Sequence, residues 1–241
     1  MVDLESGKQK LHIMQRRNIT GLVFAILSVI SFSPKAQAIL SKDQIGTTLT
    51  HFYSHPDSGT LKLLINSIQN SQEAREALPS APIVGFFSAI LLSDSPNEKI
   101  VKRELSAMHN RFELFDYALL FGKSQDTIFN WTNRKPDSND LIWGAYFGTG
   151  DTRYLDKLLG ETVLIEREDS LVLYMTGASA KWSLASNARQ HESIKKHLSR
   201  KELTADDKTK KMLWEILTKE PGEMRNDIMK RANEIKSKTN R

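Results

Sequence analysis

The chain reads Leu171-Val-Leu-Tyr174-Met175-Thr-Gly-Ala178-Ser-Ala-Lys-Trp182-Ser-Leu-Ala185 in its second half. Its apolar and small side chains at 171, 174, 175, 178, 182 and 185 recur at intervals of three and four residues. Side chains return to one face of an α-helix with this period, whereas a half-buried strand alternates every second residue. The stretch therefore predicts a long helix that buries one face.

The same spacing recurs on both sides of this stretch, in about ten short groups separated by turn residues. The groups lie near residues 61–68, 83–92, 96–108, 112–121, 126–131, 141–147, 154–159, 194–198, 212–217 and 224–235. Strand signals are scarce, since Asn-Gly and Asp-Gly turns are missing and only Val163-Leu164-Ile165 has a strand-like composition. We predict an all-α fold, either antiparallel helical hairpins stacked as a short α-solenoid or an irregular helical bundle.

The N-terminus has the layout of a secretory signal peptide. A basic stretch at residues 14–18 precedes an apolar run from Ile19 to Phe32, and a small-residue triplet ends at Ala38. The run is shorter than the ~20 residues that a membrane-spanning helix needs, so we expect cleavage after Ala38 and no integral span afterwards. Residues 1–13 make the basic region unusually long, so translation from Met1 and from Met14 both stay open.

These features divide the chain into a signal peptide, residues 1–38, and a single helical domain, residues 39–241. The domain is long enough for one core without cross-links, and the chain contains no Cys, which excludes disulfides and thiolate metal ligands. Residues 189–241 hold 15 Lys and Arg against nine Asp and Glu. We interpret this basic segment, from about residue 190, as a solvated helical face, with weak contact to an anionic envelope surface as the alternative.

One segment resembles part of a tetratricopeptide repeat. It reads Trp143-Gly144-Ala145-Tyr146-x-x-Thr149-Gly150-Asp151-x-x-Tyr154-Leu155, a helix with glycine and an aromatic residue, a Gly-Asp turn and a second helix. No second copy follows at a period near 34 residues. Residues 141–151 and 180–191 together resemble segments of a family of exported bacterial proteins with tetratricopeptide-like helices and no established activity. That resemblance implies a helical fold and a bacterial source, and it assigns no active site.

A histidine pair is the first candidate for chemistry. His51 and His55 are four residues apart with Asp57 close behind, a spacing that can bind zinc on a helix. The general base of a His-Glu-x-x-His motif is missing, and Pro56 disfavours a helical conformation at His55. We therefore predict surface histidines, with no metal and no cofactor.

A row of small polar residues is the second candidate. Ser179, Ser183 and Asn187 are spaced by four, and His191 would follow on a continuous helix. One helix face supplies neither an oriented base nor an oxyanion hole, and the Gly-x-Ser-x-Gly elbow is missing. We expect these residues to let a neighbouring helix approach and hydrogen-bond, with Asn187 as an alternative C-terminal cap.

Carboxylates and tryptophans complete the candidates. Glu113/Asp116 and Glu166/Asp169 are each three apart, and we expect Asp116 to pair with Arg111 or Arg103 rather than to act as a catalytic acid.

The four tryptophans are interpreted as one core anchor per helix pair, at positions 131, 143, 182 and 214. Nucleotide-binding glycine motifs are missing, and we expect no nucleic-acid partner.

These observations favour an exported protein of the periplasm or the extracellular space that binds another protein and has no catalytic residues. The residues of its binding site are not predicted. Two alternatives stay open: an envelope binder that uses the basic C-terminal segment, and a periplasmic hydrolase with a dispersed site.

Overall fold

The computed structural model describes residues 39–77, 79–129 and 134–239. Every regular element in these ranges is helical and none is a strand, which confirms the all-α prediction. The predicted signal peptide, residues 1–38, lies outside the described residues, and so does Trp131.

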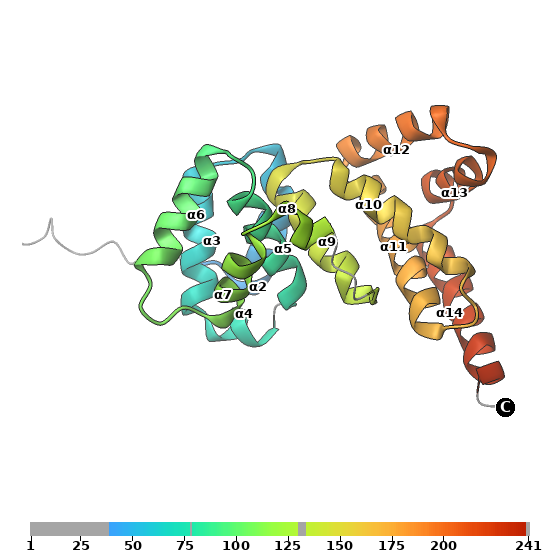
Figure 1. Ribbon diagram of the computed structural model, residues 1–241, viewed down its shortest axis with the longest axis horizontal. Coiled ribbons are helices and arrows are strands. Elements are labelled where there is room, and N and C mark those ends of the chain that lie inside the picture. The colour runs from blue at the N-terminus through green and yellow to red at the C-terminus, as the bar shows by residue number, and fades with distance from the viewer. Residues whose placement is uncertain (1–38, 78, 130–133, 240–241) are drawn as a thin grey trace, which may run out of the picture. The chain divides into compact units, whose positions relative to one another are not determined.

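The helices follow one another through short turns (Figure 1). The first eight elements are α2 (Lys42–His51), the 3₁₀ turn η1 (Phe52–Ser54), α3 (Ser58–Asn70), α4 (Gln72–Ala77), α5 (Ser80–Leu91), α6 (Pro96–Ala107), α7 (Glu113–Phe121) and α8 (Gln125–Phe129). The others are α9 (Pro136–Thr149), α10 (Arg153–Glu161), the 3₁₀ turn η2 (Thr162–Glu166), α11 (Leu171–Gln190), α12 (Glu192–Thr204), α13 (Asp207–Thr218) and α14 (Pro221–Thr239).

Several boundaries follow from the local sequence. Ser41 and Asp57 accept hydrogen bonds from backbone N–H groups in the first turns of α2 and α3, as N-terminal caps do. Pro96 opens α6 at its first turn. Gly150 ends α9 with a left-handed backbone, φ 71°, which glycine adopts without steric cost.

The closest helix packing is between α5 and α9, which are far apart in the chain. A Cβ atom at Gly85 of α5 would lie 1.9 Å from the backbone oxygen of Leu141, and one at Gly144 of α9 would lie 1.9 Å from the backbone oxygen of Pro82. Only glycine permits this approach of the two backbones. Because α7 also packs on α5, the latter is buried nearly all round, as its apolar sequence predicts.

The order of contacts favours the irregular bundle over the solenoid. Helices of a solenoid contact mainly their neighbours in sequence, because each repeat stacks on the next. Here α9 packs on α5 and also on α11, and α11 packs on α14 (Figure 1). The single tetratricopeptide-like segment, α9 with α10, is thus part of a bundle with non-sequential packing.

The decisive stretch forms α11, a helix of 20 residues. Tyr174, Ala178 and Ala185 are buried as predicted, while Trp182 is only partly covered. Residues 163–165, the one stretch with a strand-like composition, belong to η2, which packs against α11, in agreement with the all-α prediction. A short apolar run cannot be assigned to strand or helix from periodicity alone.

Candidate functional site

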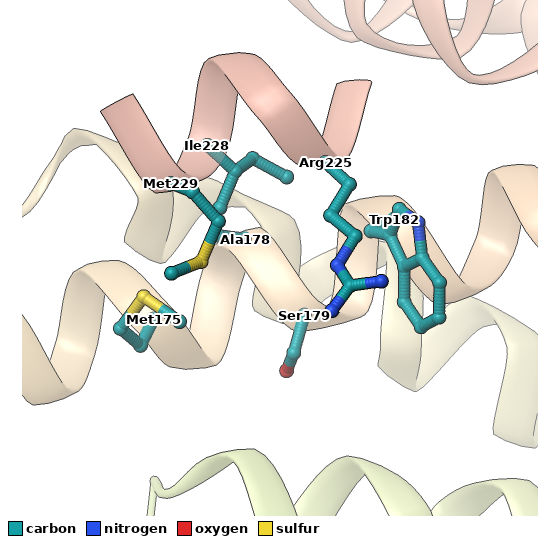
Figure 2. A pocket seen from close by; sticks show the side chains of 7 residues that line it. All are labelled: Met175, Ala178, Ser179, Trp182, Arg225, Ile228 and Met229. Atoms are coloured by element: carbon teal, nitrogen blue, oxygen red, sulfur yellow. The ribbon is translucent and has the colours of Figure 1, made fainter. Parts of the chain in front are cut away.

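The candidate site is an apolar groove between α11 and α14, with a volume of about 280 Å³ (Figure 2). We call it the α11–α14 groove. Seven residues line it: Met175, Ala178, Ser179 and Trp182 of α11 with Arg225, Ile228 and Met229 of α14. Figure 2 shows Met175 and Met229 at one end of the groove, and Arg225 reaching from α14 toward the end that holds Trp182.

The groove exists because partly exposed residues lie beside the buried stripe of each helix. On α14, Met224, Ile228 and Ile235 are buried against the bundle, whereas Met229 is 46% exposed. On α11, Trp182 is 37% exposed beside the buried Ala178. The indole is held in place at the mouth of the groove, since its Nε1–H donates to the backbone oxygen of Pro221 at 3.1 Å.

This position corrects the prediction that Trp182 is a core anchor. Ala178 and Ala185 already fill the narrow side of α11 that faces the core, so the large indole occupies the edge of the stripe. The prediction is also wrong for Trp214 of α13, which is exposed. It is confirmed for Trp143, which is 5% exposed and stacks on Phe147 with ring centroids 5.4 Å apart.

Polar side chains join α11 to α9, and one of them, Ser179, also lines the groove. Asn139 of α9 donates from Nδ2 to Ser179 Oγ at 2.6 Å, and Trp143 donates from Nε1 to Ser183 Oγ at 2.8 Å. Figure 2 shows the Ser179 hydroxyl directed away from α14. These bonds confirm that the serine row lets a neighbouring helix approach and hydrogen-bond. Asn187 is not a C-terminal cap, because its amide donates to the backbone oxygen of Ser183 at 2.9 Å.

The fourth member of that row belongs to a different cluster. His191 lies between the end of α11 and the start of α12, so α11 does not continue through it, and its Nδ1 lies 3.1 Å from the hydroxyl of Tyr53. That hydroxyl also lies 2.8 Å from Ser193 Oγ, which is 3.3 Å from the hydroxyl of Tyr146. The ring of His51 lies 5.0 Å from that of His191. We call these residues the Tyr–His cluster.

Burial sets the acid–base properties of the Tyr–His cluster. Desolvation, with a smaller contribution from the charge of His51, lowers the pKa of His191 below its usual value. Burial also raises the pKa of Tyr146 to about 12. Both groups are therefore neutral near pH 7, and they join η1, α9 and α12 through hydrogen bonds rather than ionic bonds.

The structure does not gather the histidine pair into a metal site. Among the residues that the structure describes, no group of three His, Cys, Asp or Glu side chains is placed to hold a metal ion. Asp57 caps α3, where its Oδ2 accepts from the Thr60 backbone N–H at 2.7 Å. His51 ends α2 and faces His191, while Pro56 follows His55 outside any helix.

Charged groups converge in a hollow of about 320 Å³ on another side of α14. They form three ion pairs of opposite charge: Lys181 with Glu215, Lys219 with Asp227, and Arg231 with Glu168. The cations lower the pKa of the Asp227 and Glu168 carboxyls. Each of these carboxylates thus has a cation at contact distance, and the pairs link α11 to α13, and α14 to the end of α13 and to the turn after η2.

Three of the other predicted carboxylates, Asp116, Glu166 and Asp169, are also paired. Arg111 Nε donates to Asp116 Oδ1 at 2.9 Å, so the expected partner is confirmed, although Asp116 is exposed rather than buried in α7. Glu166 pairs with Lys208 and Asp169 with Arg167. Cations of the basic segment also form ion pairs at several positions; for example, Lys201 Nζ lies 2.9 Å from Asp156 Oδ2. These pairs agree with a helical face of mixed charge.

Within the described ranges, no helix combines the length and the apolar character needed to cross a bilayer. Comparison with protein-family models, with curated proteins and with solved structures finds no match to this chain. The resemblance to a family of exported bacterial proteins therefore stays an expectation from the sequence.

Proposed function

We propose that the protein is an exported, non-catalytic interaction module that binds another protein through the α11–α14 groove. One observation carries the proposal: the groove is an apolar depression whose single charged side chain, Arg225, makes no ion pair in the described part of the chain. By contrast, the carboxylates described above already have cationic partners: Asp116, Glu166, Glu168, Asp169 and Asp227.

The openness of the groove, whose volume is at the lower end of the range for small-molecule sites, favours a partner side chain over a small-molecule ligand. Sites for small molecules usually enclose roughly 300–1,000 Å³ and bury most of the ligand. A cavity of about 280 Å³ that is open to solvent suits one or two apolar side chains of a larger partner. Its lining is also typical of protein interfaces, because Trp and Arg are enriched there and flexible Met side chains adapt to different shapes.

The lining also explains why we favour binding over catalysis. A catalytic pocket needs a nucleophile or a general base that is free to react. The one hydroxyl in the lining, that of Ser179, already donates to the backbone oxygen of Thr176 at 3.0 Å and accepts from Asn139. Arg225 can bind an anion, but a guanidinium offers only N–H donors and no acceptor that could serve as a nucleophile or a base.

Export is the second part of the proposal and rests on the sequence of residues 14–38. If the signal peptide is cleaved as we expect, N-terminal sequencing of the protein from a bacterial host should begin within a residue or two of Ile39. Full-length protein in the cytosol would contradict this part and leave the groove unaffected.

The binding proposal is tested by an affinity pull-down from envelope extract with matched variants. Met229→Glu places a charge in the groove, and Leu203→Glu makes the same kind of change at a residue of α12 that is 79% exposed and does not line the groove. We expect one protein to be retained by the wild type and by Leu203→Glu, but lost with Met229→Glu. Retention by all three at low salt, with release at high salt, would favour the envelope binder with its basic segment.

A further inference from the structure

The guanidinium of Arg225 faces walls that contain no carboxylate. The whole of α11, residues 171–190, has neither Asp nor Glu. On α14, the positions one turn from Arg225 are Pro221, Gly222, Ile228 and Met229. Arg231, on the same helix, shows the contrast, because it pairs with Glu168 and with Glu234 one turn away.

An arginine in this setting selects its ligand by charge and by shape. The guanidinium presents five N–H donors in a planar fork that matches a carboxylate, and it stays charged at any physiological pH. Figure 2 shows this group at one end of the groove and the thioethers of Met175 and Met229 at the other. An occupant that satisfies both ends must therefore carry an anionic group and an apolar group close together.

We propose that the groove recognises an acidic–apolar segment of the partner protein, in which one aliphatic or aromatic side chain enters between Met175 and Met229 and a nearby carboxylate binds Arg225. This inference rests on the proposed function and specifies its partner. The absence of carboxylates from the groove walls favours an acidic segment over a basic one, because a Lys or Arg of the partner would meet only Arg225 there.

The test uses selection of peptides rather than an unknown partner. A library of random peptides displayed on phage is panned on the purified full chain, on Arg225→Glu, and on Arg200→Glu as the control. Arg200 is exposed on α12, does not line the groove, and gives the same change of charge. Circular dichroism checks that each variant keeps the helical fold.

We expect wild type and Arg200→Glu to enrich peptides with Asp or Glu beside an apolar residue, and Arg225→Glu to enrich Lys or Arg at that place. Replacing the acidic residue of a selected peptide by its amide should weaken binding to the wild type about two- to fivefold, as for a partly exposed ion pair. The same replacement should not weaken binding to Arg225→Gln.

Two results would overturn the inference and are distinguishable from failure of the proposed function. Apolar peptides without charge preference, whose binding is lost with Met229→Glu, would leave the groove as a docking site and remove the acidic requirement. A wild-type dimer that Met229→Glu converts to a monomer would make a second copy of this chain the occupant. If no selected peptide depends on Met229, the groove itself is not the binding site, and both proposals fail.

Discussion

At the scale of single residues, Trp143 and Trp182 show how one residue type serves two purposes. Trp143 is surrounded by Tyr146 and Phe147 and gives its indole N–H to Ser183. Trp182 gives its N–H to the backbone of Pro221 and leaves more than a third of its surface in contact with solvent. The first stabilises the fold, and the second is available to a partner.

The two tryptophans should therefore differ in their contribution to stability. Trp143→Ala leaves a large cavity and should lower the free energy of unfolding by about 3–5 kcal/mol. Trp182→Ala removes a partly exposed side chain and should cost less than about 2 kcal/mol. Urea unfolding followed by circular dichroism measures both. Equal losses would mean that Trp182 is part of the core and would weaken the assignment of the groove.

His191 is a residue-scale test of the Tyr–His cluster. Its pKa is lowered in the folded chain, so the unfolded chain binds the proton more readily. Stability should therefore decrease as the pH falls below about 6.5, the usual value, and should stop decreasing below the folded pKa.

Unfolding in urea at several pH values between about 7.5 and 5 measures this dependence, since that range spans the usual pKa of histidine. His191→Gln should remove the part of the slope that arises from this residue, and His109→Gln, at an exposed site, should leave it unchanged. An unaltered slope in His191→Gln would show that the cluster does not disfavour the charged imidazole.

At the scale of elements, the contact of α5 with α9 organises the N-terminal part of the bundle. Two glycines, Gly85 and Gly144, permit it because each faces a backbone oxygen of the other helix. The tetratricopeptide-like appearance of the sequence around Gly144 has a direct physical cause here, which is the close approach of α5. Repetition of a structural unit is not needed to explain it.

A pair of glycine substitutions separates this close packing from helix propensity. Gly144→Ala places a methyl group where the Pro82 oxygen lies, so it should destabilise the protein by more than the ~1 kcal/mol that alanine adds to a helix. Gly46→Ala in α2 meets no atom within 4 Å and should stabilise by about 0.5–1 kcal/mol. Thermal unfolding of both variants measures the difference, and stabilisation by Gly144→Ala would contradict the packing of α5 on α9.

The sequence predicts where helices begin and end better than it predicts which helices contact one another. The breaks at Gly122, Gly150 and His191 and the start of α6 at Pro96 are readable because their causes are local. The partial exposure of Trp182 is not readable, because it depends on α14, which follows some 40 residues later and occupies only part of that face.

At the scale of the whole molecule, the groove forms only where α14 packs against α11. The buried stripe of α14, with Met224, Ile228 and Ile235, is predicted by its spacing, but Arg225 and Met229 lie just beside it and look like ordinary surface residues in the sequence. One feature of the sequence points to the groove residues: the long helix α11 contains no acidic residue, and α14, which packs against it, is basic. Export and the binding of another protein stay predictions.

The most direct test of the groove as a docking site is photocrosslinking in cells that make the protein. A benzoylphenylalanine is placed at Met229 in the groove, and at Leu203 as a control of similar or greater exposure. If the groove binds a partner protein, irradiation should give one discrete adduct from position 229 and none from position 203. No adduct from 229, or the same adducts from both positions, would contradict the account.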